Sequence, residues 1–251
     1  YLRFSFTETV ILSDTPIAEQ IICAVDLGIN TDAVCSIMKA DGTILARKFI
    51  DFTSDKDRMI HAMNRTRRKQ SKYGPKSARG LWAYVKRLNE DRAKKISAAI
   101  VEFASQHSVD AIVMEHLDFK GCKKRGSKAQ RLSMWNHGII REKVEQKAHL
   151  LGIRIATICA WKTNALAFDG SGSVTRDDNN HALAKFTTGK QYNCDLSASY
   201  NIGARYFIRE LLKSLPATEE SRVKAKVPDA GRRTSCTLST LRALVKELSA
   251  A

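Results

Sequence analysis

The sequence predicts an α/β fold in which a mixed β-sheet is flanked by helices and carries an inserted, loop-rich lobe. Two short apolar runs end in a carboxylate, at Asp26 and at Glu115, as expected for buried strands that present an acid at one end. A third apolar run, 153–158, follows a helical pattern, which is the order expected when a helix covers a sheet. Segment 159–193 is too long and too polar for a simple connection, which indicates the lobe.

The composition indicates a polyanionic partner. The 251 residues carry a formal net charge of +16 with a pI near 9.7, and neutralisation of phosphates supplies most non-specific affinity for nucleic acid. A membrane surface or a ribosome would attract the same charge. No apolar run approaches the roughly 20 residues that span a bilayer, and residues 1–6 do not form a signal peptide. We therefore expect a reducing, cytoplasmic compartment and no membrane partner.

The six cysteines argue against a zinc site. They are scattered along the chain, and no two form the C-x-x-C pair that structural zinc sites normally use. Cys23 and Cys35 lie in apolar strand contexts, where a cysteine acts as a small core residue. A secreted, disulfide-linked protein is not indicated either.

Three strands and two helices follow in order. Residues 33–38 and 44–50 are strand candidates joined by a tight-turn signal at 41–42, so with the first strand they predict an antiparallel meander. Residues 55–72 predict a basic helix with few apolar positions, and a second helix is expected over 81–106 after a break at Gly74 and Pro75. The first helix is either a solvated face or an anion-binding surface.

The second half contains a third acid. A helix is expected over 135–151, and Asp195 stands just before an amphipathic helix that ends near Pro216. As a helix N-cap, Asp195 would need no other purpose. Residues 219–231 are expected to form a weakly ordered polar link, and 238–248 a last short helix.

A strand that ends in an acid is used in two common folds. In the RNase H-like fold the aspartate holds a divalent cation for phosphodiester hydrolysis, whereas in the actin-like ATPase fold, which includes sugar kinases, it sits at a nucleotide phosphate. A third possibility is a simple turn cap. The ATPase fold requires further Gly-rich phosphate loops, and the sequence around Asp195 does not supply them. With Asp26 and Glu115, Asp195 becomes a candidate for the third ligand of a two-metal site.

Three segments together resemble a known family. They are Val-Asp-Leu-Gly-Ile at 25–29, Ile-Val-Met-Glu-His-Leu at 112–117 and Asp-Leu-Ser-Ala-Ser-Tyr-Asn-Ile at 195–202. In this order they resemble the three split RuvC motifs of TnpB-type transposon-encoded nucleases and of their relatives, the type V CRISPR effectors. The basic segment 92–96 resembles the helix before the second motif. The resemblance covers residues 20–215.

The resemblance implies a division of the chain. Residues 1–20 would end a preceding N-terminal, oligonucleotide-binding-like region, since the chain starts without methionine. Residues 21–158 and 194–215 would form the RuvC-like nuclease domain, and 159–193 an inserted lobe that binds the target nucleic acid. The lobe departs from the family because it lacks the two C-x-x-C pairs, so zinc is not expected. Residues 216–251 would be a C-terminal tail.

The implied activity is that of the nuclease part of an RNA-guided DNA endonuclease. Asp26, Glu115 and Asp195 would hold two Mg²⁺ ions, which prefer oxygen ligands, and Arg176 would stabilise developing phosphate charge unless it is an ordinary surface residue. The alternative is a relative that binds nucleic acid without cleaving it.

The implied partners are a guide RNA, target DNA as a single strand or in an RNA–DNA heteroduplex, and the missing N-terminal part or a partner chain, in the cytoplasm of a prokaryote near the nucleoid. The residues expected to bind nucleic acid lie on the two basic helices and on a basic loop. They are Arg65, Arg67, Arg68, Lys69, Lys86, Arg87, Arg92 and Lys95 on the helices, and Lys123, Lys124 and Arg125 on the loop.

Overall fold

The computed structural model of the chain describes residues 4–5, 7–117, 134–177, 180 and 182–250. The predicted basic loop with Lys123, Lys124 and Arg125 lies outside the described residues. None of the described helices is long and apolar enough to cross a membrane.

A five-stranded mixed sheet forms the centre of the molecule. Its strands are β1 (Ile21–Asp26), β2 (Ala33–Lys39), β3 (Ile44–Ile50), β4 (Ala111–His116) and β5 (Arg154–Cys159), in the spatial order β3-β2-β1-β4-β5. The first three strands pair antiparallel, and β1, β4 and β5 pair parallel. The predicted meander and the predicted RNase H-like fold class are confirmed.

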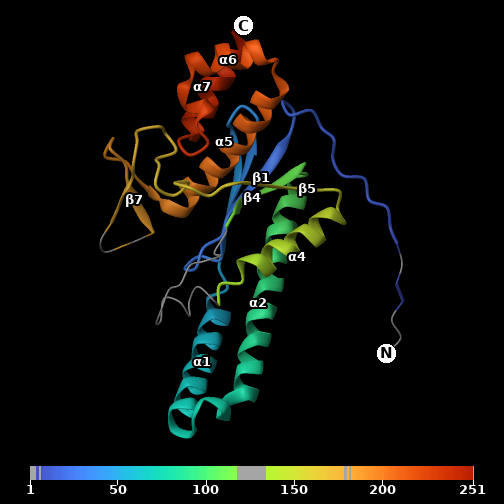
Figure 1. Cartoon of the computed structure of the whole chain (residues 1–251), viewed down its shortest axis with the longest axis vertical. Coiled ribbons are helices and arrows are strands. Elements are labelled where there is room, and N and C mark those ends of the chain that lie inside the picture. Colours follow the sequence, from blue (N-terminus) through green and yellow to red (C-terminus); the bar gives the residue numbers. More distant parts are fainter. Residues whose placement is uncertain (1–3, 6, 118–133, 178–179, 181, 251) are drawn as a thin grey trace.

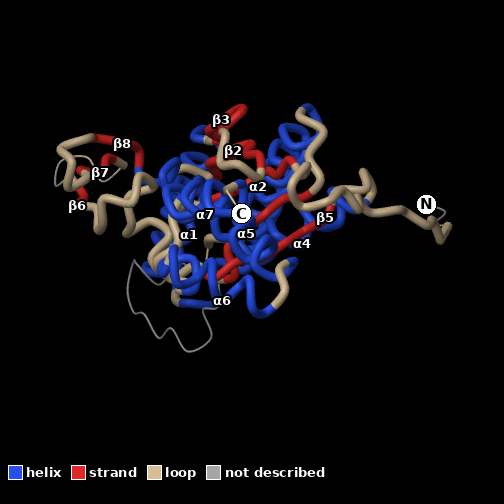
Figure 2. The backbone as a smooth tube through the Cα atoms, turned by 90° about the horizontal axis from the view of Figure 1, so that it is seen from above, coloured by secondary structure: helices blue, strands red, loops and turns tan. Residues whose placement is uncertain are grey.

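Helices cover both faces of this sheet, as Figure 1 and Figure 2 show. On one face, α2 (Arg79–Gln106) and α4 (His137–His149) pack on Cys23 and Val25 of β1. On the other face, α5 (Cys194–Ser214) and α7 (Leu238–Ser249) pack on Ile22 and Ala24. Successive side chains of a strand point to opposite faces, so the continuous apolar sequence of β1 follows from its burial on both sides.

Two helices form a hairpin that projects from the sheet (Figure 1). The first, α1 (Thr53–Tyr73), ends at Gly74, whose φ of 86° is in the left-handed region that favours glycine. A short 3-10 turn, η1 (Pro75–Ala78), leads into α2. Met59, Met63 and Val85 form a small apolar core between the helices. Because this core is small, most of the hairpin surface is polar and solvent-exposed.

The segment predicted as a lobe folds around its own apolar cluster. Three short strands, β6 (Thr175–Arg176), β7 (Leu183–Lys185) and β8 (Gln191–Asn193), form a second antiparallel sheet. Ala167, Ala184, Phe186 and Cys194 are buried in its core. The packing of these side chains explains how the segment folds without the cysteine pairs of the family that the sequence resembles.

The prediction of a weakly ordered link over 219–231 is wrong. This segment contains α6 (Ala217–Lys226) and the 3-10 turn η2 (Pro228–Gly231). One apolar side chain, Val223, is fully buried and anchors the helix, and Lys224 pairs with Glu220 one turn earlier. The predicted last helix is confirmed as α7, which begins with a capping box at Thr237.

Candidate functional site

Two of the three predicted acids lie at the same end of neighbouring strands. Asp26 is the last residue of β1, and Glu115 is the last but one of β4. These strands are parallel, and Val25 is level with Met114, so the residues that follow them, Asp26 and Glu115, emerge at the same height. The carboxyl ends of adjacent parallel strands are a common place for functional side chains.

The third acid comes from α5. Asp195 lies in the first turn of this helix, but it is not the cap, because Asn193 accepts the hydrogen bond from the Leu196 amide at 2.9 Å. The alternative that Asp195 serves only as the N-cap is therefore wrong. Helix α5 lies against β1, and the charge of Asp195 in its first turn acts on Asp26 at the end of that strand. The carboxylate of Asp195 instead receives a hydrogen bond from Thr31.

The three acids act on one another electrostatically. Burial raises the pKa of Asp26 well above its usual value, and the negative charges of Glu115 and Asp195 raise it further. Burial also raises the pKa of Glu115 and of Asp195. Such mutual repulsion among desolvated carboxylates is the condition that a bound divalent cation relieves.

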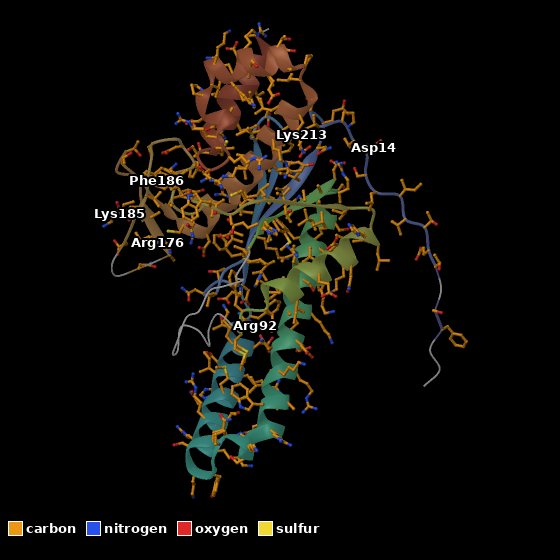
Figure 3. All side chains as sticks on the ribbon, viewed as in Figure 1. Asp14, Arg92, Arg176, Lys185, Phe186 and Lys213 are labelled. Atoms are coloured by element: carbon orange, nitrogen blue, oxygen red, sulfur yellow. The ribbon has the colours of Figure 1, made fainter. Side chains whose placement is uncertain are left out.

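The positive charge of Arg176 acts on two acids of this cluster. It lies on β6 of the lobe and is exposed, and its charge lowers the pKa of both Asp26 and Asp195, in opposition to burial. Figure 3 shows Arg176 on the lobe, and its effect on these pKa values indicates that the lobe brings a positive charge toward the acids. The predicted role of Arg176 in stabilising developing phosphate charge stays a prediction.

Neighbouring side chains hold the acids in place, and the sequence did not reveal them. The hydroxyl of Thr163 donates to Glu115, and the backbone carbonyl of Thr163 accepts from Asn201 on α5 at 3.0 Å. Arg205 adds a positive charge that lowers the pKa of Glu115. Asn201 and Arg205 are polar residues on the buried side of an amphipathic helix. A polar residue at such a position could have indicated from the sequence that it has a hydrogen-bonding role. Thr163 lies in a polar segment and gave no such indication.

The donor set fits a hard divalent cation in its chemistry. Carboxylate oxygens are the ligands that Mg²⁺ prefers. Within the described part of the chain, however, no group of three or more His, Cys, Asp or Glu side chains is already close enough to hold a metal ion.

Most predicted nucleic-acid-binding residues lie exposed on the helical hairpin. They are Arg65, Arg67, Arg68 and Lys69 on α1 and Lys86 and Arg87 on α2. Lys95 is also on the surface, where it pairs with Asp55 at 2.8 Å and with Asp91 at 3.2 Å. The hairpin thus gathers exposed positive charge on an element that stands away from the sheet.

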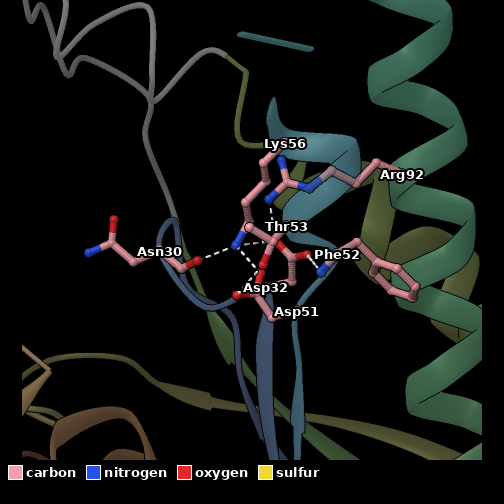
Figure 4. A network of polar contacts seen from close by, with 7 residues as sticks. All are labelled: Asn30, Asp32, Asp51, Phe52, Thr53, Lys56 and Arg92. Atoms are coloured by element: carbon pink, nitrogen blue, oxygen red, sulfur yellow. Dashed lines mark hydrogen bonds and ion pairs between the residues drawn. The ribbon is translucent and has the colours of Figure 1, made fainter. Parts of the chain in front are cut away.

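The structure corrects the prediction for Arg92. Its side chain is 8% exposed and pairs with Asp32, which is buried, so it is not available to a phosphate. Lys56 lies 3.3 Å from the same carboxylate, and Asp32 also accepts from the Phe52 amide at 2.8 Å (Figure 4). Lys56 further donates to the carbonyl of Asn30. This network joins the loop after Asp26 to the base of the hairpin.

Comparisons with known proteins show the fold. No family model matches the sequence, and no curated protein is significantly similar to it. Among solved structures, the chain is similar to a Cas12f1–sgRNA–target DNA complex, with a TM-score of 0.57 and 21% identity over 76% of this chain and 51% of that chain. A CRISPR-Cas12f ternary complex gives a TM-score of 0.51 and 16% identity over 75% and 40%.

A third structure, an AacC2c1–sgRNA binary complex, matches with a TM-score of 0.53 and 10% identity over 75% of this chain and 39% of that chain. The chain therefore shares the fold of part of these proteins and spans about half of their length or less. At this level of identity the likeness concerns the fold, and function has to be argued from the residues.

Proposed function

We propose that this chain is the nuclease part of an RNA-guided DNA endonuclease that hydrolyses phosphodiester bonds in DNA. The observation that carries the proposal is the cluster of Asp26, Glu115 and Asp195, which come from two adjacent strand ends and a helix. Burial and the charges of Glu115 and Asp195 together raise the pKa of Asp26. A fold shared with complexes of Cas12f1 and AacC2c1 supports it.

The three carboxylates are the proposed ligands of divalent cations, with two Mg²⁺ ions as the expected occupants. When bound, these ions supply activation of the attacking water and stabilisation of the leaving oxygen. Thr163 and Thr31 orient the carboxylates of Glu115 and Asp195 through the hydrogen bonds described above. Such partners of metal ligands typically contribute to metal affinity.

Arg176 has the proposed role of stabilising negative charge on the phosphate during cleavage. Its charge already acts on Asp26 and Asp195 across the site. Arginine suits this role because its guanidinium matches a phosphate with two parallel hydrogen bonds.

The proposed partners are a guide RNA and target DNA. The exposed cations of the hairpin support this because they would contact the phosphate backbone of a heteroduplex or of a single strand. In the similar structures, the sgRNA and the target DNA are bound by those proteins. For this chain, a guide RNA and target DNA are proposed partners. An enzyme that cuts DNA in this way would act in the cytoplasm of a prokaryote, at the nucleoid.

The test is cleavage of single-stranded DNA in Mg²⁺ by the wild-type chain and by Asp26→Asn, Glu115→Gln and Asp195→Asn, with and without co-purified RNA. We expect each variant to lose at least about a hundredfold in rate, because each removes a charge that binds the cations. Glu102→Gln is the matched control, since Glu102 is exposed on α2 away from the cluster.

Two results would contradict the proposal. Cleavage that persists in all three variants would mean that the acids are not the catalytic site. Binding of RNA without cleavage by the wild-type chain would instead identify a relative that binds nucleic acid only.

A further inference from the structure

A large pocket lies next to the acid cluster, on the side of β5. Its volume is about 790 Å³, within the range of ligand sites. The lining begins at His116 and Leu117, which directly follow Glu115, and continues along β5 to Trp161. The opposite wall is α5 from Arg205 to Lys213, which corresponds to about 12 Å of helix. The pocket therefore runs along α5 from Arg205, whose charge acts on Glu115, to Lys213, which Figure 3 labels.

Cations outnumber carboxylates among the charged residues that line this pocket. Five cationic side chains and one carboxylate line it: Arg205, Arg209, Lys213, Lys224, Arg233 and Glu220. Lys224 pairs with Glu220, while Arg209 and Lys213 share Glu210 at 2.6 Å and 3.2 Å. Arg233 is exposed and forms no ion pair within the described part of the chain. An anion with several charges is the ligand that such a lining attracts.

Arg205 holds the two sides of the pocket together at its inner end through hydrogen bonds to backbone carbonyls. Its guanidinium donates to the carbonyls of Cys159 and Trp161, both at 2.8 Å, and to those of Thr234 and Cys236 at 3.1 Å and 3.3 Å. These bonds join the end of β5 to the segment before α7. The side chain is 5% exposed, so the two walls of the pocket are held together by a buried donor.

Trp161 provides a flat apolar surface at the rim. Its side chain is 65% exposed, which is unusual for tryptophan, while its carbonyl is held by Arg205. An exposed aromatic ring beside clustered cations is the combination that binds single-stranded nucleic acid, because bases stack on the ring and phosphates meet the cations. The bases of a duplex are already stacked on one another and cannot do this.

We propose that this pocket binds one single strand of nucleic acid, with a base stacked on Trp161 and phosphates at Lys213 and Arg233, and leads it toward Glu115. The proposal rests on the proposed nuclease function, and it assigns the strand a path that the acid cluster alone does not define. DNA and RNA share the required chemistry, so the two are distinguished by experiment.

The experiment measures binding of fluorescein-labelled oligo-dT to the full chain in EDTA, which excludes cleavage. We expect Trp161→Ala to weaken binding by roughly tenfold, the effect of losing one base stack, and Trp161→Phe to restore most of it. The double variant Lys213→Ala/Arg233→Ala should weaken binding comparably. Lys39→Ala is the matched control, because Lys39 is an exposed cation at the opposite end of β2 from the acids.

Oligo-U, a DNA duplex and dTMP complete the series as competitors. Stronger competition by oligo-dT than by the duplex supports the proposal, and the tighter of oligo-dT and oligo-U identifies the strand. Complete competition by dTMP at the same concentration would overturn it in favour of a mononucleotide site. Unchanged oligo-dT affinity in the pocket variants, with a wild-type chain that cleaves, would overturn this inference alone. Reduced affinity with a wild-type chain that does not cleave supports the pocket and contradicts the nuclease proposal.

Discussion

Asp110 connects the segment before β1 to the start of β4. Its carboxylate accepts hydrogen bonds from the hydroxyls of Ser13 and Thr15 and from the Ile21 amide, at 2.8 Å for the amide. Burial acts to raise the pKa of Asp110, but these hydrogen bonds and the charge of Arg154 outweigh it and leave the pKa below its usual value. The ionised carboxylate therefore stabilises the folded state.

This effect predicts a pH dependence of stability. Because the pKa of Asp110 is lower in the folded chain than in the unfolded chain, its contribution is present above about pH 4 and is lost as pH falls through the folded value. Asp110→Asn should lower the free energy of unfolding at neutral pH by about 1–2 kcal/mol, with less effect in acid. Urea unfolding at a series of pH values measures this, with the exposed turn residue Asp41→Asn as the control. An equal loss at all pH values would contradict the ionic explanation.

For single residues, the sequence predicted which acids lie at strand ends, but it did not predict the side chains that form hydrogen bonds with them. Asp26 and Glu115 could be placed because each ends an apolar run, and a run buried on both faces is visible without knowledge of the fold. Thr31 and Thr163 meet the acids only after the chain has folded. Arg92 was wrongly assigned to the surface because its partner, Asp32, is 60 residues away in the sequence.

The packing of α5 on the sheet depends on one small residue. A Cβ atom at Gly203 would lie 2.9 Å from Cε of Met38 and 3.2 Å from Cβ of Ala24, both of them buried. The absence of a side chain at this position lets the helix that carries Asp195 approach β1 and β2 closely. The helix position and hence the site depend on this contact.

Replacement of Gly203 by alanine tests this contact. Alanine favours a helix by up to about 1 kcal/mol over glycine, but overpacking of a core costs about 1–3 kcal/mol. We expect Gly203→Ala to lower the free energy of unfolding by about 1 kcal/mol and to reduce cleavage through displacement of α5. Gly80→Ala is the control, since nothing lies within 4 Å of the added atom, and it should be neutral or stabilising. Stabilisation by Gly203→Ala in thermal unfolding would contradict the proposed close packing.

Element boundaries were predictable where apolar periodicity was strong. The strands and α5 followed from apolar runs, whereas α6 was missed because Val223 is the single fully buried side chain in a polar stretch. Short helices of this kind take most of their stability from tertiary packing rather than from their own sequence. The contacts that order 217–231 became visible only with the fold.

Much of the positive charge of the molecule lies on the helical hairpin, away from the central sheet. The net charge of +16 is concentrated in part on the projecting hairpin, whereas Asp26, Glu115 and Asp195 lie at strand ends and in the first turn of α5. The sequence indicated the sheet, the basic helices and a polyanionic partner, but not that the network at Asp32 joins the hairpin to the loop after Asp26. Through that loop, nucleic acid held on the hairpin would be positioned relative to the acids.

The hairpin charge predicts a specific salt dependence. If Arg65 and Arg68 each neutralise one phosphate, Arg65→Ala/Arg68→Ala should reduce the slope of log affinity against log salt by about 1.5–2, because each contact releases counterions. Lys39→Ala/Lys246→Ala removes the same charge from exposed positions outside the hairpin and should leave the slope nearly unchanged. Thermal stability should be unaffected in both, since surface substitutions rarely change it much. Equal loss of slope in the two double variants would mean that nucleic acid responds to the net charge of the molecule, and the hairpin would then have no specific contact with it.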